Sequence, residues 1–200
     1  MLVEDWMKRS FAKIEKGSKV GEAKKILRES SSSCGIACSD RSFLGMVKAD
    51  ELLGIEDDLS VDEYIHNLAY TLDPQDTLDE AAVFFLESDL QILPVVSNDE
   101  VIGALSLFDI LDAFTQMAGF GEGGIRLEVE LKDTPGALKN VLDVLYLHSM
   151  NVLSILLYPA EQIGKKVVII RVEGKSVREL SRILDVNEIS YTSIIKEEKI

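Results

Sequence analysis

The chain is a tandem duplication, because a shift of 58 residues aligns its first part with its second part without a gap. Similar residues recur at this interval throughout: Gly21-Glu22-Ala23 with Asp79-Glu80-Ala81, Glu29-Ser30 with Glu87-Ser88, Ser39 with Ser97, Gly45 with Gly103, and Leu53 with Leu111. Two copies of one α/β unit predict a pseudo-twofold module with ligand sites between the copies. Such an arrangement is more typical of a sensor than of a catalyst.

The charged residues are distributed unevenly along the sequence, and their distribution disfavours the binding of some classes of partner. The net charge is −14, and residues 61–124 contain thirteen Asp and Glu but no Lys or Arg. This field repels phosphate backbones, so nucleic acid is not an expected partner. The longest stretch without charged residues, 144–160, is too short and too polar for a membrane span. The N-terminal residues lack the apolar region of a signal peptide, so we expect a soluble, cytoplasmic protein.

The cysteines and histidines do not form a metal-binding pattern. Cys34 and Cys38 align with Ile92 and Val96 of the second copy, which favours two buried, free thiols on a strand. His66 and His148 belong to different segments and lack the spacing of a zinc site. We therefore expect no metal.

The apolar pattern of each copy predicts a short strand, a helix, two strands and a second helix. In the second copy, Thr77-Leu-Asp-Glu80 has the form of a capping box for a helix whose apolar face is 78, 81, 82, 85 and 86. Further elements are predicted at 91–96, 101–105 and 107–116, and in the first copy at 19–29, 34–38, 43–47 and from about 49. Ser60-Val-Asp-Glu63 predicts a short connecting helix between the copies.

A Gly-rich stretch separates the duplication from a region of different pattern. Residues 118–124 are predicted to be a linker. Strict alternation over 125–131 predicts a half-buried strand, and Pro135 suits the first turn of a helix. Strands at 152–158, 167–172 and 189–195 and a helix starting at Ser176 complete a βαββαβ order. The predicted domains are 1–58 and 59–117 for the copies, the linker, and 125–200.

These patterns resemble known families. The repeated unit, with Gly45-Met-Val-Lys-Ala-Asp-Glu-Leu52 aligned with Gly103–Leu111, resembles the CBS domain, here as a tandem pair (a Bateman module). Asp133-Thr-Pro-Gly-Ala-Leu138, followed by Asn151-Val152, resembles an ACT domain. The whole layout resembles the acetoin-utilisation accessory family. The resemblance implies an α/β (α+β) fold: two βαββα repeats with pseudo-twofold symmetry and a βαββαβ ferredoxin-like ACT domain.

The CBS resemblance implies an adenine nucleotide or adenosyl ligand between the copies. It assigns ribose hydroxyls to Asp109 and phosphate to Ser106, and a helix N-terminus favours phosphate. Ser-x-x-Asp is equally the pattern of a helix cap, and both roles can hold together. In the first copy Lys48 and Glu51 replace the pair, which puts that site in doubt. Because the second copy has no cation, Arg9, Lys13 or Lys48, or a divalent ion, would have to neutralise a phosphate.

The ACT resemblance implies an amino acid bound between two copies of the domain. The matching positions are Asp133, Gly136, Ala137, Leu138, Asn151 and Val152. Here the backbone at Gly136 can approach a ligand carboxylate, and Asp133 can hold an ammonium group. The alternative is a plain turn and helix start at 133–136, and a helix-ending residue at Asn151.

We therefore expect a regulatory protein that is not an enzyme, since no acid–base pair or nucleophile occurs at an interpretable spacing. Expected ligands are AMP, ADP, ATP or S-adenosylmethionine, with no required cofactor. Expected partners are a separate metabolic enzyme or transporter, and a second copy in at least a homodimer. The alternative is a scaffold module that docks on an enzyme and binds nothing small.

Overall fold

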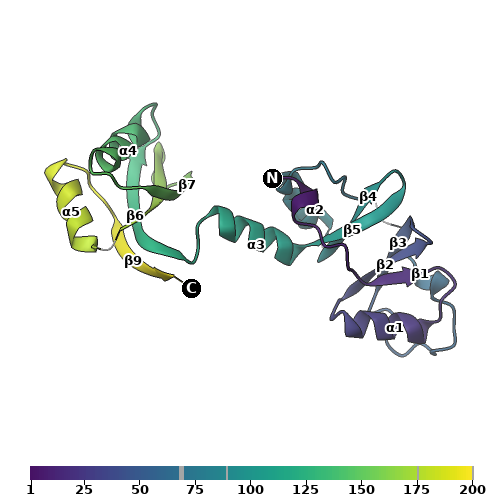
Figure 1. The fold of residues 1–200 in the computed structure, drawn as a ribbon. Coiled ribbons are helices and arrows are strands. Elements are labelled where there is room, and N and C mark those ends of the chain that lie inside the picture. The colour runs from purple at the N-terminus through teal and green to yellow at the C-terminus, as the bar shows by residue number, and fades with distance from the viewer. Residues whose placement is uncertain (68–69, 89, 175, 200) are drawn as a thin grey trace. The chain divides into compact units, whose positions relative to one another are not determined.

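The computed structural model describes residues 1–67, 70–88, 90–174 and 176–199. Contacts divide the chain into two compact units, Met1–Ala113 and Phe114–Ile200, each with its own sheet (Figure 1). This division falls at 113/114. The narrower domain boundaries at 58/59, 117/118 and 124/125 stay predictions.

The first unit is built on a five-stranded sheet in the order β1-β2-β3-β5-β4. The strands are β1 (Lys13–Glu15), β2 (Cys34–Ser39), β3 (Ser42–Lys48), β4 (Ile92–Ser97) and β5 (Glu100–Ser106). The helices are α1 (Val20–Glu29), α2 (Leu78–Ser88) and α3 (Leu107–Met117), of which the last extends past the boundary of the unit. Short 3₁₀ helices cover Val3–Asp5 and Val61–Tyr64.

Strand pairing confirms the predicted duplication. In the first copy Ile14 pairs with Ala37 in parallel, and in the second copy Leu72 pairs with Val95 in parallel, 58 residues later. The β2–β3 hairpin has a register shift between Ala37 and Cys38, and the β4–β5 hairpin has one at the equivalent place. The two copies therefore share their backbone irregularities as well as their apolar pattern.

The two copies are related by a local twofold arrangement. Ser42 of β3 pairs antiparallel with Glu100 of β5, and these are equivalent positions of the duplication. Lys8 bridges Ala104 in the second copy, and its equivalent His66 bridges Met46 in the first copy. Each copy is thus covered by the segment that precedes the other, an exchange that fixes how the copies pack.

The helix α2 begins with the predicted capping box. The Thr77 backbone N–H and Oγ1 donate to Glu80 Oε2 at 3.0 and 2.8 Å, and the Glu80 backbone N–H donates back to Thr77 Oγ1 at 3.4 Å. Leu78, Ala81 and Phe85 are buried as predicted. Leu86 is 85% exposed, so the prediction of a buried residue at this position is wrong.

Two other predictions need correction. The helix expected from about residue 49 is absent, since residues 49–54 form turns. Lys48 occupies the position that is equivalent to Ser106, the residue that caps the helix in the second copy. Gly54 has a left-handed φ of 77°, a conformation that ends helices. The predicted short connecting helix after Ser60 is present as a 3₁₀ helix, in which Ser60 Oγ accepts from Asp62 N. The linker expected over 118–124 overlaps a strand that already begins at Glu122.

The second unit has the predicted βαββαβ order. Its elements are β6 (Glu122–Lys132), α4 (Ala137–Leu147), β7 (Val152–Pro159), β8 (Lys165–Val172), α5 (Val177–Val186) and β9 (Ser193–Lys199). The sheet order is β7-β8-β6-β9 with all neighbours antiparallel, and α4 and α5 lie on one face (Figure 1). Ile125, Leu127 and Val129 of β6 are buried in its core, as the alternation predicts. The last strand begins at Ser193 rather than 189.

Candidate functional site: a cleft between the two copies

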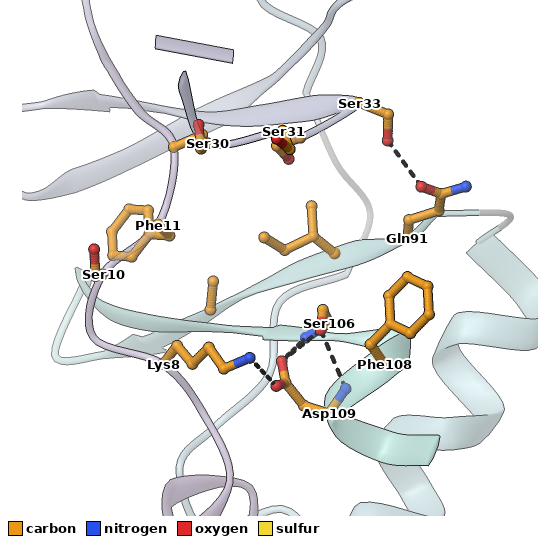
Figure 2. A pocket seen from close by; sticks show the side chains of 14 residues that line it. Lys8, Ser10, Phe11, Ser30, Ser31, Ser33, Gln91, Ser106, Phe108 and Asp109 are labelled. Carbon is orange, nitrogen blue, oxygen red and sulfur yellow. Dashed lines mark hydrogen bonds and ion pairs between the residues drawn. The ribbon is translucent and has the colours of Figure 1, made fainter. Parts of the chain in front are cut away.

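A cleft of about 230 Å³ lies between the two copies of the first unit. Figure 2 shows Lys8, Asp109 and Ser106 on one wall and a row of serines on the facing wall, with Phe11 and Phe108 at the sides. Its lining residues are Lys8, Ser10, Phe11, Ala12, Ser30, Ser31, Ser32, Ser33, Gln91, Ile92, Ala104, Ser106, Phe108 and Asp109. The cleft thus combines one charged corner, several hydroxyl groups and apolar side walls.

Asp109 lies in the first turn of α3, directly after β5, and is 6% exposed. Its Oδ2 accepts hydrogen bonds from the Ser106 backbone N–H at 2.8 Å and from Ser106 Oγ at 2.5 Å. The Asp109 backbone N–H donates to Ser106 Oγ at 3.2 Å. The capping interpretation of Ser-x-x-Asp is therefore confirmed, and the same pair also lines the cleft.

Lys8 is the residue of this site that the sequence did not indicate. Its Nζ lies 2.7 Å from Asp109 Oδ1. The backbone of Lys8 is fixed by a reciprocal pair with Ala104, with N···O distances of 2.8 and 2.9 Å. Gly103 makes room for this approach, because a Cβ there would lie 3.0 Å from the Lys8 carbonyl oxygen. The sequence indicates the Lys8–Asp109 pair only indirectly, because the 58-residue shift aligns Lys8 with His66 and Asp109 with Glu51, so that each copy has one basic and one acidic residue at these positions.

The ion pair shifts both pKa values in the direction that favours the charged forms. The hydrogen bond and the charge of Asp109 raise the pKa of Lys8. Burial of Asp109 disfavours its ionised form, but the hydrogen bonds from Lys8 and Ser106 outweigh this and lower the pKa of the carboxyl group. Asp109 is therefore an anion at neutral pH, and its Oδ1 can accept a further hydrogen bond beside the contact with Lys8.

A second cleft of about 480 Å³ lies at the equivalent place on the first copy and is lined by Ser33, Cys34, Lys48, Ala49, Asp50, Leu53, Leu90 and Gln91. Lys48 is among these lining residues, and its predicted contact with a phosphate stays a prediction. Glu51 does not line it and instead pairs with His66, the counterpart of the Asp109–Lys8 pair. Ser33 Oγ donates to Gln91 Oε1 at 3.0 Å, and these equivalent positions border both clefts.

Arg9 and Lys13, predicted to neutralise a phosphate, do not line the Asp109 cleft. They line a separate hollow of about 330 Å³, together with Arg41 and Glu100. Lys13 pairs there with Glu15, and Arg41 lies 3.4 Å from Glu100. The structure therefore brings Asp109, Ser106 and Lys8 together, and places the three predicted cations elsewhere.

The residues predicted to hold an amino acid do not meet within one chain. Asp133 follows the end of β6, where its carboxylate lies 3.0 Å from Lys166 Nζ. Gly136 precedes α4 with a φ of 87° and open space around its Cα. Asn151 and Val152 lie at the other end of the sheet, where Val152 pairs with Val172. A hollow of this unit is lined by other residues: His148, Ser176, Arg178, Glu179, Arg182 and Ile183.

The remaining chemical groups have structural roles. Cys34 and Cys38 are free and buried, and burial raises the pKa of both thiols, as expected for apolar strand residues. Within the described ranges, no three His, Cys, Asp or Glu side chains gather closely enough to hold a metal ion. Among the same residues, no helix has the length and apolar character to cross a membrane.

Comparison with known proteins agrees with this architecture. Residues 61–116 match the family model of the CBS domain. A Thermotoga maritima crystal structure described as a CBS domain pair/ACT domain protein is 28% identical, with a TM-score of 0.55 over 58% of this chain and 98% of that chain. The CBS domains of a Streptococcus pneumoniae transcriptional regulator are 15% identical, with a TM-score of 0.52 over 56% of this chain and 98% of that chain.

A protein from Methanocaldococcus jannaschii is 19% identical, with a TM-score of 0.56 over 74% of this chain and 68% of that chain. At these identities the last two structures support the fold alone. The second copy therefore matches the CBS domain in sequence, and the mixed α+β fold of the chain is that of a CBS pair with an ACT-like C-terminal unit.

Proposed function

We propose that this protein is a non-catalytic regulatory sensor that binds an adenine nucleotide or related adenosyl compound in the Asp109 cleft. The observation that carries the proposal is the Asp109 carboxylate, which is nearly buried, ionised and located at the start of a helix on the wall of that cleft. Ser106 and Lys8 occupy three of the roughly four acceptor sites of this carboxylate, so Oδ1 can accept one further hydrogen bond from a ribose hydroxyl. The CBS resemblance implies the same ligand class.

The apolar side walls suit the base of such a ligand. Phe11, Ile92 and Phe108 line the cleft beside the charged corner, and Phe108 is 78% exposed. Burying an aromatic surface of this kind against a flat base gives both hydrophobic and stacking energy. Because the cleft is formed by both copies, a ligand in it would bias how the copies pack and so change the populations of two arrangements.

The first prediction tests Asp109 directly. The wild-type protein should bind at least one of AMP, ADP, ATP and S-adenosylmethionine in isothermal titration, and Asp109→Asn should weaken that binding about tenfold to a hundredfold, because hydrogen bonds to a charged group are lost. The side-chain oxygen of asparagine can still accept the hydrogen bonds from Ser106, so this variant preserves the helix cap better than Asp109→Ala would. Glu51→Gln changes the equivalent carboxylate outside the cleft and should leave the affinity unchanged.

Equal affinity in wild type and Asp109→Asn would remove Asp109 from the binding site. If none of the four compounds binds, the sensor proposal fails.

A docking module that binds nothing small is the second candidate, and one feature favours it. Val83, Leu86 and Phe108 on α2 and α3 are exposed, whereas the equivalent positions of the first copy are Lys25, Arg28 and Asp50. Only the second copy therefore presents apolar side chains at these positions, as a surface for a partner enzyme, a transporter or a second copy of the chain would. A thermal-shift screen without any response to nucleotides or amino acids would favour this role over ligand sensing.

A further inference from the structure

We propose that Lys8 selects the charge of the ligand, so that the Asp109 cleft takes an adenosine with a single phosphate in preference to a triphosphate or a cationic adenosyl compound. This inference rests on the function proposed above and deepens it. It assigns Lys8 a position between two anions, the Asp109 carboxylate and the ligand phosphate.

The cleft contains very few charged groups. Among its described lining residues, Lys8 is the one cation and Asp109 the one anion, and the others are neutral. Residues 61–124 add no Lys or Arg and contribute thirteen acidic residues. Arg9, Lys13 and Lys48 line other hollows. A phosphate in this cleft therefore has a single nearby positive charge.

The ammonium group of Lys8 is accessible from solvent. The side chain of Lys8 is 69% exposed, whereas that of Asp109 is 8% exposed. A phosphate can thus approach Nζ from solvent while the buried carboxylate keeps its contact on the other side. An ammonium group has three donors and acts as a compact point charge, so it can serve both anions at once. The backbone pair with Ala104 keeps Lys8 at this wall.

Neutral donors complete a phosphate site without adding charge. Within the described part of the chain, the hydroxyl groups of Ser10 and Ser31 have no hydrogen-bond partner, and both residues line the cleft. Ser30, Ser32 and Ser33 donate their hydroxyl protons to Ile26 O, Cys34 O and Gln91 Oε1. The free hydroxyls of Ser10 and Ser31 are therefore the available donors, with Ser10 close to Phe11 in Figure 2.

One accessible cation and two neutral hydroxyl donors favour a ligand with a single phosphate. One cation compensates much of the charge of AMP. The larger negative charge of ATP would meet the same single cation, with the carboxylates of Asp109 and Asp112 close to Lys8, at a Coulomb cost that a divalent ion would relieve. The positive groups of S-adenosylmethionine would instead be repelled by Lys8. Adenosine keeps the contact with Asp109 and loses the contact with Lys8.

The test is a set of titrations in EDTA with AMP, adenosine, ATP and S-adenosylmethionine. Wild type should bind AMP about tenfold more tightly than each of the other three, as expected for one charge-assisted contact. Lys8→Met should abolish this preference for AMP over adenosine, with adenosine affinity changed by less than about threefold, a sign that the cleft is intact. Lys8→Arg should retain the preference, and Lys13→Met is a matched control that should leave the order unchanged.

The outcomes separate the two proposals. Tighter binding of ATP than AMP by wild type in EDTA would overturn the selection by Lys8 and leave the sensor function standing. An AMP preference that persists in Lys8→Met would do the same. If Lys8→Met does not fold, wild type alone decides, because the preference for AMP over adenosine should fall with rising salt and a constant ratio would contradict the inference. Absence of binding by all four compounds would overturn both proposals.

Discussion

Arg171→Met is expected to lower the free energy of unfolding of the C-terminal unit by about 3 kcal/mol, because it leaves a partly buried carboxylate and a buried carbonyl oxygen without their donor. Arg171 is 3% exposed. Its Nε and Nη2 donate to the two carboxylate oxygens of Glu197 at 2.8 and 3.2 Å, and its Nη1 donates to the Ala118 carbonyl oxygen at 3.0 Å. The guanidinium also lies 4.6 Å from the centre of the Phe120 ring.

Native-state hydrogen exchange of the β6 and β8 amides measures this loss. Arg182→Met, on the exposed side of α5, is the matched control and should change the stability by less than about 0.5 kcal/mol. Arg171→Lys keeps the charge but lacks the planar fork, so an intermediate loss is expected. A loss below about 1 kcal/mol in Arg171→Met would show that the buried pair does not stabilise this unit.

Gly45→Ala is expected to destabilise the first unit by about 3 kcal/mol through a backbone collision. A Cβ at Gly45 would lie 2.3 Å from the His66 carbonyl oxygen, which is also the acceptor for the Met46 N–H at 2.8 Å. The segment that crosses from the second copy onto the first would therefore have to move. The loss should appear in urea denaturation followed by the fluorescence of Trp6, the single tryptophan.

Gly17→Ala separates the collision from backbone strain. Gly17 has a φ of 79°, and nothing lies within 4 Å of a Cβ built on it. Alanine there should cost only about 1 kcal/mol, from the left-handed conformation. Equal losses of unfolding free energy in Gly45→Ala and Gly17→Ala would mean that the segment at His66 can move at little cost. The conclusion that the exchanged segments fix how the copies pack would then be wrong.

The duplication made most of the first unit predictable from the sequence. A fixed interval of 58 residues transfers one copy's strands to the other, and the pairing of Cys34 with Lys48 and of Ile92 with Ser106 follows this rule. The first copy departs from this correspondence after Lys48, where it lacks the helix that the second copy has, and the reason is local. Lys48 cannot cap as Ser106 does, and Gly54 adopts a conformation that ends helices.

The candidate site was only partly predictable because its parts meet through tertiary structure. Asp109 and Ser106 are three residues apart and carry a recognisable pattern. Lys8 reaches Asp109 only because the segment before each copy covers the other copy, a feature that no local pattern encodes. The same limit applies to Asp133 and Asn151, which lie at opposite ends of one sheet and would need a second chain to meet.

A crystal structure of the protein with AMP would show whether the cleft between the copies is the ligand site. We expect the nucleotide in this cleft, with a ribose hydroxyl donating to Asp109 and the phosphate within hydrogen-bond distance of Lys8 Nζ. A cleft without nucleotide at saturating AMP, or a nucleotide bound away from Asp109, would contradict this expectation.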